Sequence, residues 1–247
     1  GVQDFKVVQL TLHPHQRATL DMAAATDKLR VLCTYGFRTS GDILQKQISR
    51  WDSSITDKFD MHFLDGPLPA TGKSEVEGIF PPPYYERFQY NKDFTEFNNL
   101  DKAFSLIVDY MEKNGPFDGL LGFSQGAMLC AAVVCYQPKG AMLRNHPPIS
   151  FIISISGVKF RDREMSAFLY PPHIKCPSVH VTGAKDYVKE LSQELIQAFE
   201  NPLVIRHPHG HVVPKLDGQA VREVNQFIES LMQKRFNEKH NALLAKL

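Results

Sequence analysis

The sequence predicts an α/β fold in which a mostly parallel central sheet of about six core strands is flanked by helices. Short apolar runs alternate with longer segments of helical periodicity along most of the chain, which is typical of a parallel sheet covered on both faces. The chain has 247 residues, of which 43% are hydrophobic, enough for one domain with a sizeable core. No apolar run is long enough to span a membrane.

Six apolar runs are predicted to form the core strands, and five helical patterns lie between or after them. The strands are expected at Leu29–Cys33, Met61–Leu64, Leu120–Phe123, Phe151–Ile155, Ser178–Val181 and Leu203–Arg206. The helices are expected at Gly41–Trp51, Leu100–Asn114, Gln125–Tyr136, Lys189–Glu200 and Gly218–Phe236. The third helix is apolar nearly all round and should be buried, whereas the last has one apolar face and should lie outside.

The domain is predicted to span residues 28–236, between an extension at 1–27 and a tail at 237–247. We interpret residues 1–21 as an extension or expression remnant with no part in catalysis; alternation at 5–12 is also compatible with an edge strand. Residues 66–99 form a long excursion between a strand and a helix, rich in aromatic and proline residues. Such excursions are usually lids or binding loops.

Charge and cysteine content argue against several classes of function. The 28 basic and 27 acidic side chains nearly balance, so nothing favours nucleic acid or an anionic membrane as a partner. The four cysteines have no C-x-x-C spacing and lie mostly in apolar runs: Cys33, Cys130, Cys135 and Cys176. We therefore expect reduced thiols in a cytoplasmic protein, with no disulfide framework, metal or other cofactor.

Ser124 is the candidate nucleophile, because Gly122-Phe123-Ser124-Gln125-Gly126 matches the pattern G-x-S-x-G. In that pattern the serine occupies a sharp turn between a strand and a helix, and the glycines let the two elements approach closely. The apolar run before the motif and the buried helix after it supply the required context. The alternative interpretation is an ordinary glycine-flanked turn.

A nucleophilic serine needs a base and an acid that orients the base. In folds with this turn the acid and then the base follow the serine along the chain. His211 is favoured as the base, because it follows the last core strand in a loop that Gly210 makes flexible. Asp186 is favoured as the acid because it directly follows the preceding strand, although a lone aspartate there more often caps a helix. The remaining candidates are interpreted as bystanders or solvated charges: His207, His209, Asp162 and Glu164.

An oxyanion hole requires two backbone N–H groups. The sequence predicts one from Gln125, after the nucleophile, and the other from Phe37, in the loop after the first core strand. Residues of that loop and of the excursion are predicted to contact the substrate: Tyr35, Gly36, Arg38, Phe80, Tyr84, Tyr85 and Phe88. The aromatic cluster of the excursion also includes Tyr90, Phe94 and Phe97, and its alternative interpretation is a satellite core.

Together these motifs resemble those of the FSH family of serine hydrolases. The resemblance rests on the segments 32–41, 115–126 and 210–214, and residues 72–80 resemble the plant members in particular. It covers about residues 28–232 and implies the α/β-hydrolase fold, with Ser124, Asp186 and His211 as a catalytic triad. One departure is Tyr35, where the family usually has histidine.

The resemblance implies hydrolysis of a carboxylic ester or thioester through an acyl-enzyme on Ser124, without a cofactor. The expected substrate is small and has an apolar acyl group. One alternative is an acyltransferase, which uses the same acyl-enzyme with another acceptor. The other is a ligand-binding or signalling module with slow turnover, which only Tyr35 favours.

Overall fold

A six-stranded sheet forms the centre of the computed structural model, which describes residues 28–170 and 173–245; the predicted extension at 1–27 lies outside this part of the chain. The strand order is β10-β9-β8-β7-β1-β2, and every neighbouring pair is parallel. The strands are β1 (Leu29–Thr34), β2 (Phe59–Phe63), β7 (Gly119–Phe123), β8 (Phe151–Ile155), β9 (Ser178–Gly183) and β10 (Leu203–His207). All six predicted core strands are confirmed, with small shifts at their ends.

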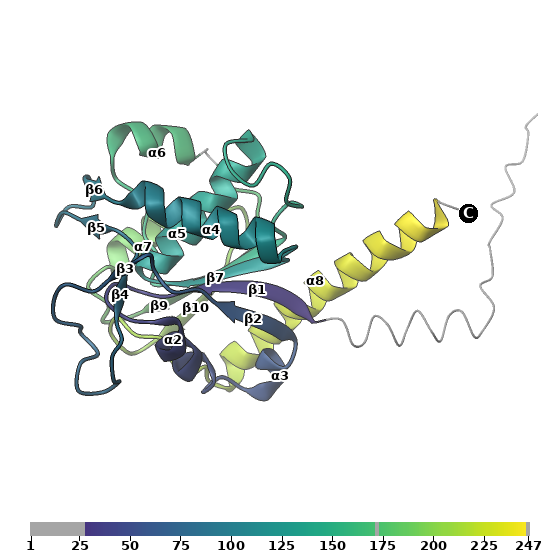
Figure 1. Cartoon of the computed structure of the whole chain (residues 1–247). Helices are drawn as coiled ribbons and strands as arrows, with labels where there is room; N and C mark the ends of the chain where they lie inside the picture. The colour runs from purple at the N-terminus through teal and green to yellow at the C-terminus, as the bar shows by residue number, and fades with distance from the viewer. Residues whose placement is uncertain (1–27, 171–172, 246–247) are drawn as a thin grey trace, which may run out of the picture.

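Helices cover both faces of this sheet (Figure 1). One face carries α4 (Leu100–Asn114), α5 (Gln125–Tyr136), α6 (Arg163–Leu169) and α7 (Lys189–Ile196). The other face carries α2 (Gly41–Ile48), α3 (Ser53–Thr56) and α8 (Gly218–Leu244). Among the described residues, no helix has both the length and the apolar character needed to cross a membrane.

Helix α5 lies at the centre of its face and packs on β7 and β8. Every residue from Gln125 to Cys135 is buried, as the uniformly apolar sequence predicts. The short 3₁₀ helix η1 (Gln137–Lys139) follows it. Two helices are shorter than predicted: α2 ends at Ile48 and α7 at Ile196, because tight turns follow both.

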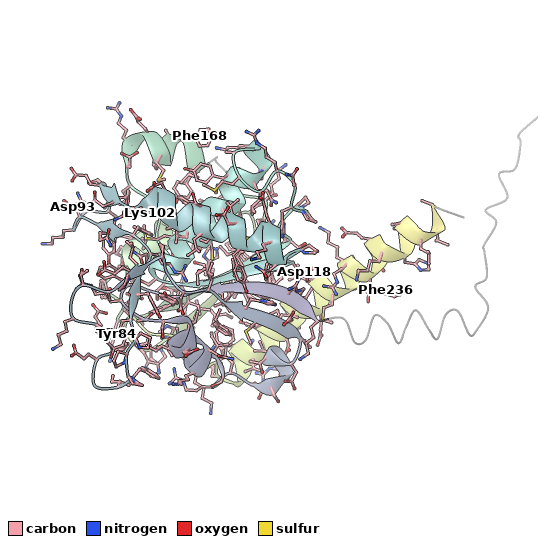
Figure 2. All side chains as sticks on the ribbon, viewed as in Figure 1. Tyr84, Asp93, Lys102, Asp118, Phe168 and Phe236 are labelled. Atoms are coloured by element: carbon pink, nitrogen blue, oxygen red, sulfur yellow. The ribbon has the colours of Figure 1, made fainter. Side chains whose placement is uncertain are left out.

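Helix α8 is longer than predicted and continues past Phe236 to Leu244. Its first half packs on the sheet through an apolar face, whereas its last turns extend beyond the sheet, where Figure 2 labels Phe236. Residues 237–244 contain no proline or glycine, so nothing in their sequence ends the helix. The sequence prediction followed the apolar periodicity, which stops earlier.

Asp118 links α8 to the end of the sheet at which the strands begin (Figure 2). Its Oδ2 accepts hydrogen bonds from the backbone N–H of Arg30 and from Nη1 of Arg235, both at 2.7 Å. The guanidinium of Arg235 also donates to the carbonyl of Lys28, at the start of β1. The projecting part of α8 therefore lies at the amino ends of the strands, away from their carboxyl ends.

The excursion at 66–99 contains two small antiparallel sheets. In the first, β3 (Leu68–Pro69) pairs with β4 (Tyr85–Glu86); in the second, β5 (Gln89–Tyr90) pairs with β6 (Phe97–Asn98). Between β3 and β4 the chain forms an outer loop at 70–84, which Arg38 holds. Nη1 of Arg38 donates to the carbonyl of Lys73, at 3.4 Å. The backbone carbonyl of Arg38 accepts a hydrogen bond from Oγ of Ser74, at 2.6 Å.

The second half of the excursion is anchored in the core. Arg87 is fully buried, lies 4.3 Å from the centre of the Tyr35 ring and donates to the carbonyl of Leu64. Phe88 is also fully buried and packs against Phe97 and Phe160. For these rings the structure therefore matches the alternative interpretation of the aromatic cluster as a satellite core.

Candidate active site

Ser124 occupies a strained turn between β7 and α5, with φ 52° and ψ −117°. A non-glycine residue in such a conformation costs about 1–3 kcal/mol and is found mostly at functional sites. The flanking glycines make the turn possible. A Cβ on Gly126 would lie 2.3 Å from the carbonyl oxygen of Thr34, and one on Gly122 would lie 2.5 Å from the backbone of Ala127.

The structure brings Ser124, His211 and Asp186 together at the carboxyl ends of β7, β10 and β9. The distance from Ser124 Oγ to His211 Nε2 is 2.8 Å. Nδ1 of His211 lies 2.9 Å from Oδ1 and 3.1 Å from Oδ2 of Asp186. A carboxylate is an acceptor, so Nδ1 carries the proton and Nε2 is free to accept the hydroxyl proton of Ser124. Of the three histidines in this loop, His211 is the one that hydrogen-bonds Ser124.

Asp186 is buried and receives two further hydrogen bonds. Oγ of Ser156 donates to Oδ2 at 2.6 Å, and the backbone N–H of Val188 donates to Oδ1 at 3.0 Å. Burial alone would raise the pKa of Asp186, but the hydrogen bonds from His211, Ser156 and Val188 outweigh burial and hold that pKa below its usual value. Asp186 is therefore ionised at neutral pH and can orient a protonated or neutral His211.

Ser156, which sequence reasoning missed, lies directly after β8 and is buried. Its φ of 51° is again rare for a residue with a Cβ. Nothing in its local sequence marks it, because its partner Asp186 is 30 residues away along the chain. The run Ser154-Ile155-Ser156-Gly157 at the end of a predicted strand was the one available signal. The geometry makes Ser156 a positioning residue for Asp186.

Replacing Ser156 with alanine is expected to lower kcat/KM about tenfold, since a hydrogen bond to a charged group is worth about 1.5 kcal/mol or more. Without this donor the pKa of Asp186 rises. Because Asp186 and His211 are coupled through their hydrogen bond, the acid limb of the pH profile of kcat/KM shifts to higher pH. The matched control is Ser154→Ala, on β8, where the buried hydroxyl has no hydrogen-bond partner among the residues that the structure describes. An unshifted acid limb in Ser156→Ala would exclude the positioning role.

The two predicted oxyanion-hole donors belong to segments that adjoin the nucleophile. Gln125 is the first residue of α5, so its N–H has no acceptor within the helix. The N–H of Phe37 donates to no group among the described residues. A Cβ on Gly36 would lie 3.3 Å from Cβ of Ser124, so the loop before Phe37 approaches the nucleophile closely.

Two cavities meet at Ser124. The larger, of about 620 Å³, opens to the surface between the loop 36–39, the end of α2, the outer loop of the excursion and the loop 209–215. The smaller is a narrow space of about 20 Å³ with a mixed lining that contains no charged side chain: Tyr90, Phe94, Ser124, Gln125, Met128, Ser156, Val158, Tyr187 and Val188. Two aromatic residues of the excursion, Tyr90 and Phe94, therefore border the nucleophile.

The residues predicted to contact the substrate divide into two groups. Gly36, Arg38 and Phe80 line the larger cavity. In the described part of the chain, the other four residues line neither cavity. Tyr35 and Phe88 are buried in the core. Tyr84 donates a hydrogen bond to the carbonyl of Phe80, and Tyr85 pairs with Pro69 in the first small sheet. Tyr187 and Ile79, which sequence reasoning did not select, line the larger cavity instead.

Tyr35 has a structural role that the sequence did not reveal, in contact with Arg87 and Gly66. Its ring faces the guanidinium of Arg87, and its hydroxyl oxygen accepts a hydrogen bond from the backbone N–H of Gly66. Burial is the largest of the effects that raise its pKa well above the usual value. These contacts fix the start of the excursion.

Cysteine and metal chemistry are not indicated at this site. Three of the four thiols are buried, and all four are free. Burial raises the pKa of Cys130 to about 11. Within residues 28–170 and 173–245, no group of three or more His, Cys, Asp or Glu side chains is arranged to hold a metal ion.

The parallel sheet, the strained serine between β7 and α5, and the partners after β9 and β10 define an α/β-hydrolase fold with a serine site. Esterase PE8 is a solved structure with this fold: it superposes with a TM-score of 0.57 at 18% identity, over 84% of this chain and 94% of that one. The sequence matches the family described as serine hydrolase (FSH1) over residues 23–222, and the chain belongs to that family.

Two relatives illustrate the range of the family. Esterase OVCA2 from Bos taurus is 30% identical over 210 residues, which are 77% of this chain and 92% of that protein. A Schizosaccharomyces pombe protein named dihydrofolate reductase is 29% identical over 205 residues, 76% of this chain. The chain spans 44% of that protein, so it corresponds to about half of this relative.

Proposed function

We propose that this protein hydrolyses carboxylic esters or thioesters through an acyl-enzyme on Ser124. The observation that carries the proposal is the continuous hydrogen-bonded chain from Ser124 through His211 to the buried carboxylate of Asp186. Membership of a serine hydrolase family and similarity to esterases support it.

In the first half of the reaction, His211 Nε2 takes the proton of Ser124 Oγ as that oxygen attacks the substrate carbonyl carbon. Asp186 holds the resulting imidazolium in place, and the N–H groups of Phe37 and Gln125 stabilise the oxyanion. The bond to the leaving group then breaks, and His211 returns its proton to that group. Water attacks the acyl-enzyme by the same route in reverse, which releases the acid and restores Ser124.

The narrow cavity beside Ser124 has no charged lining residue, which supports an uncharged acyl group. Met128, Val158 and Val188 come from three different segments and present no charge to the space beside Ser124. Tyr90 and Phe94 add stacked rings whose centres lie 4.9 Å apart. At about 20 Å³ the space holds about one small group, so it favours a short acyl group.

A fluorophosphonate probe tests the proposal directly, because it phosphonylates only an activated serine. We expect labelling of one serine, Ser124, identified by peptide mass spectrometry, and no labelling of Ser124→Ala. Prior incubation with p-nitrophenyl butyrate should compete with labelling and release nitrophenolate in a burst. A folded wild-type protein that resists the probe would refute the proposal.

A further inference from the structure

The larger cavity carries an excess of positive charge. Four cations and one carboxylate line it: Arg38, Arg50, Lys73, Lys215 and Glu75. Arg38 is already neutralised, because its Nε lies 2.7 Å from the buried carboxylate of Glu86. Among the described residues, no carboxylate lies within ion-pairing distance of Arg50, Lys73 or Lys215. We propose that these three side chains bind an anionic group on the leaving group of the substrate, an inference that rests on the proposed function.

Arg50 is held in place for such a role. Its Nη2 donates to the carbonyl of Val213 at 2.8 Å, and its Nε donates to the carbonyl of Gln47 at 3.3 Å. Its Nη1 donates to no group among the described residues, so one edge of the guanidinium remains for a ligand. Val213 is two residues after His211, which places this guanidinium beside the loop that carries the base.

The position of the cations relative to His211 assigns them to the leaving group. His211 must reach the leaving atom to return its proton, so the leaving group lies on the His211 side of the scissile bond. Lys215 and Val213, which anchors Arg50, belong to the same loop as His211. The acyl group is assigned to the narrow cavity, where no lining residue is charged.

Glu75 is the one carboxylate in this lining. Burial is the largest of the causes that raise the pKa of Tyr90, and the negative charge of Glu75 is the next. Tyr90 borders both cavities. Lys73 precedes Glu75 by two residues on the same outer loop. Among the described residues, no ion pair joins Glu75 to the cations of the larger cavity.

Exposed apolar side chains also line this cavity. Ile79 is 75% exposed, Tyr187 70% and Val212 42%, and these are three of the five large apolar side chains that are exposed in the described part of the chain. Tyr187 also packs against the His211 ring, with centres 4.6 Å apart. An amphipathic leaving group fits this lining, with an apolar part near the scissile bond and an anionic end near the cations.

Binding of an anionic leaving group does not change the acyl-transfer step. Ser124 Oγ bonds to the carbonyl carbon as its proton passes to His211, and the bond from that carbon to the oxygen or sulfur of the leaving group breaks. The leaving group departs as an alcohol or thiol with the proton from His211, and its phosphate or carboxylate is unchanged. The cations act by attracting and orienting the substrate.

Three butyryl thioesters with different thiols test the inference. Butyryl-coenzyme A carries phosphates, S-butyryl-3-mercaptopropionate carries one carboxylate, and butyryl-N-acetylcysteamine is neutral. We expect kcat/KM for at least one anionic thioester to exceed that of the neutral one by about tenfold or more at low salt. The preference should fall as salt screens the charges. The preferred anion then identifies which acidic group the cations recognise.

Variants connect that preference to the cations. Arg50→Gln and Lys215→Gln are each expected to reduce the ratio of anionic to neutral kcat/KM at least about threefold, mainly through KM. Lys46→Gln is the matched control, since Lys46 is an exposed cation of α2 outside the cavity lining, and it should leave the ratio unchanged.

Equal kcat/KM for the three thioesters, or a preference for the neutral one, would overturn the inference. So would an anionic preference that survives both cavity variants. In each case labelling of Ser124 by the fluorophosphonate probe would leave the proposed hydrolase function intact, whereas failure of that labelling would remove both.

Discussion

Replacing Asp186 with asparagine is expected to lower kcat about 10⁴-fold while leaving the fold intact. Three donors share the two carboxylate oxygens of Asp186: Nδ1 of His211, Oγ of Ser156 and the N–H of Val188. An amide offers one oxygen and one NH₂ group, so the NH₂ group must face one of these donors. If it faces His211, Nδ1 becomes the acceptor and Nε2 carries the proton, and Ser124 loses its base.

The measurement is kcat for p-nitrophenyl butyrate, together with thermal unfolding to show that the variant is folded. Asp217→Asn is the matched control. Asp217 caps α8 by accepting from the N–H of Ala220 at 2.8 Å, and asparagine caps helices equally well. A fall of less than about tenfold in folded Asp186→Asn would exclude Asp186 as the orienting acid.

Gly126→Ala is expected to destabilise the protein by about 3 kcal/mol, because the new methyl group meets backbone atoms. Its Cβ would lie 2.3 Å from the carbonyl oxygen of Thr34 and 2.7 Å from that of Tyr35. Neither can move without separating α5 from the end of β1. Activity should fall as well, since the loop that carries Phe37 follows directly.

Circular dichroism during heating measures this effect as a decrease in Tm of about 6–12 °C. Gly218→Ala is the control, because Gly218 begins α8 and its Cβ would meet only Nη1 of Arg222, at 3.6 Å. Alanine there should keep or slightly raise Tm. A decrease below about 2 °C in Gly126→Ala would mean that α5 and β1 tolerate more separation than this packing implies.

The sheet and its central helix were predictable from the sequence because their apolar residues recur with simple periods. Phe151–Ile155 and Gln125–Tyr136 have the bounds that the pattern predicts. Ser124 and its two partners were predictable for a different reason. The turn that holds a nucleophilic serine needs glycines at fixed spacing, and parallel strands bring their carboxyl ends to one edge, so loops far apart in sequence meet there.

The residues that line the cavities at Ser124 were harder to predict, because aromatic content does not say which way a ring points. Phe88 follows Arg87 into the core, whereas Tyr90 and Phe94 reach the narrow cavity. Tyr35 was the one residue that favoured a binding module with slow turnover. Its side chain is 1% exposed and packs against Arg87, so it no longer favours that alternative.

The outward course of α8 has a practical consequence for work with the purified protein. Its last turns leave the globule at the end of the sheet where the strands begin (Figure 1). The larger cavity lies at Ser124, where β7 ends. A biosensor tether or affinity handle attached after Leu244 would be held off by a rigid helical stalk. Immobilised through that stalk, the protein would present its cavity to the flowing substrate.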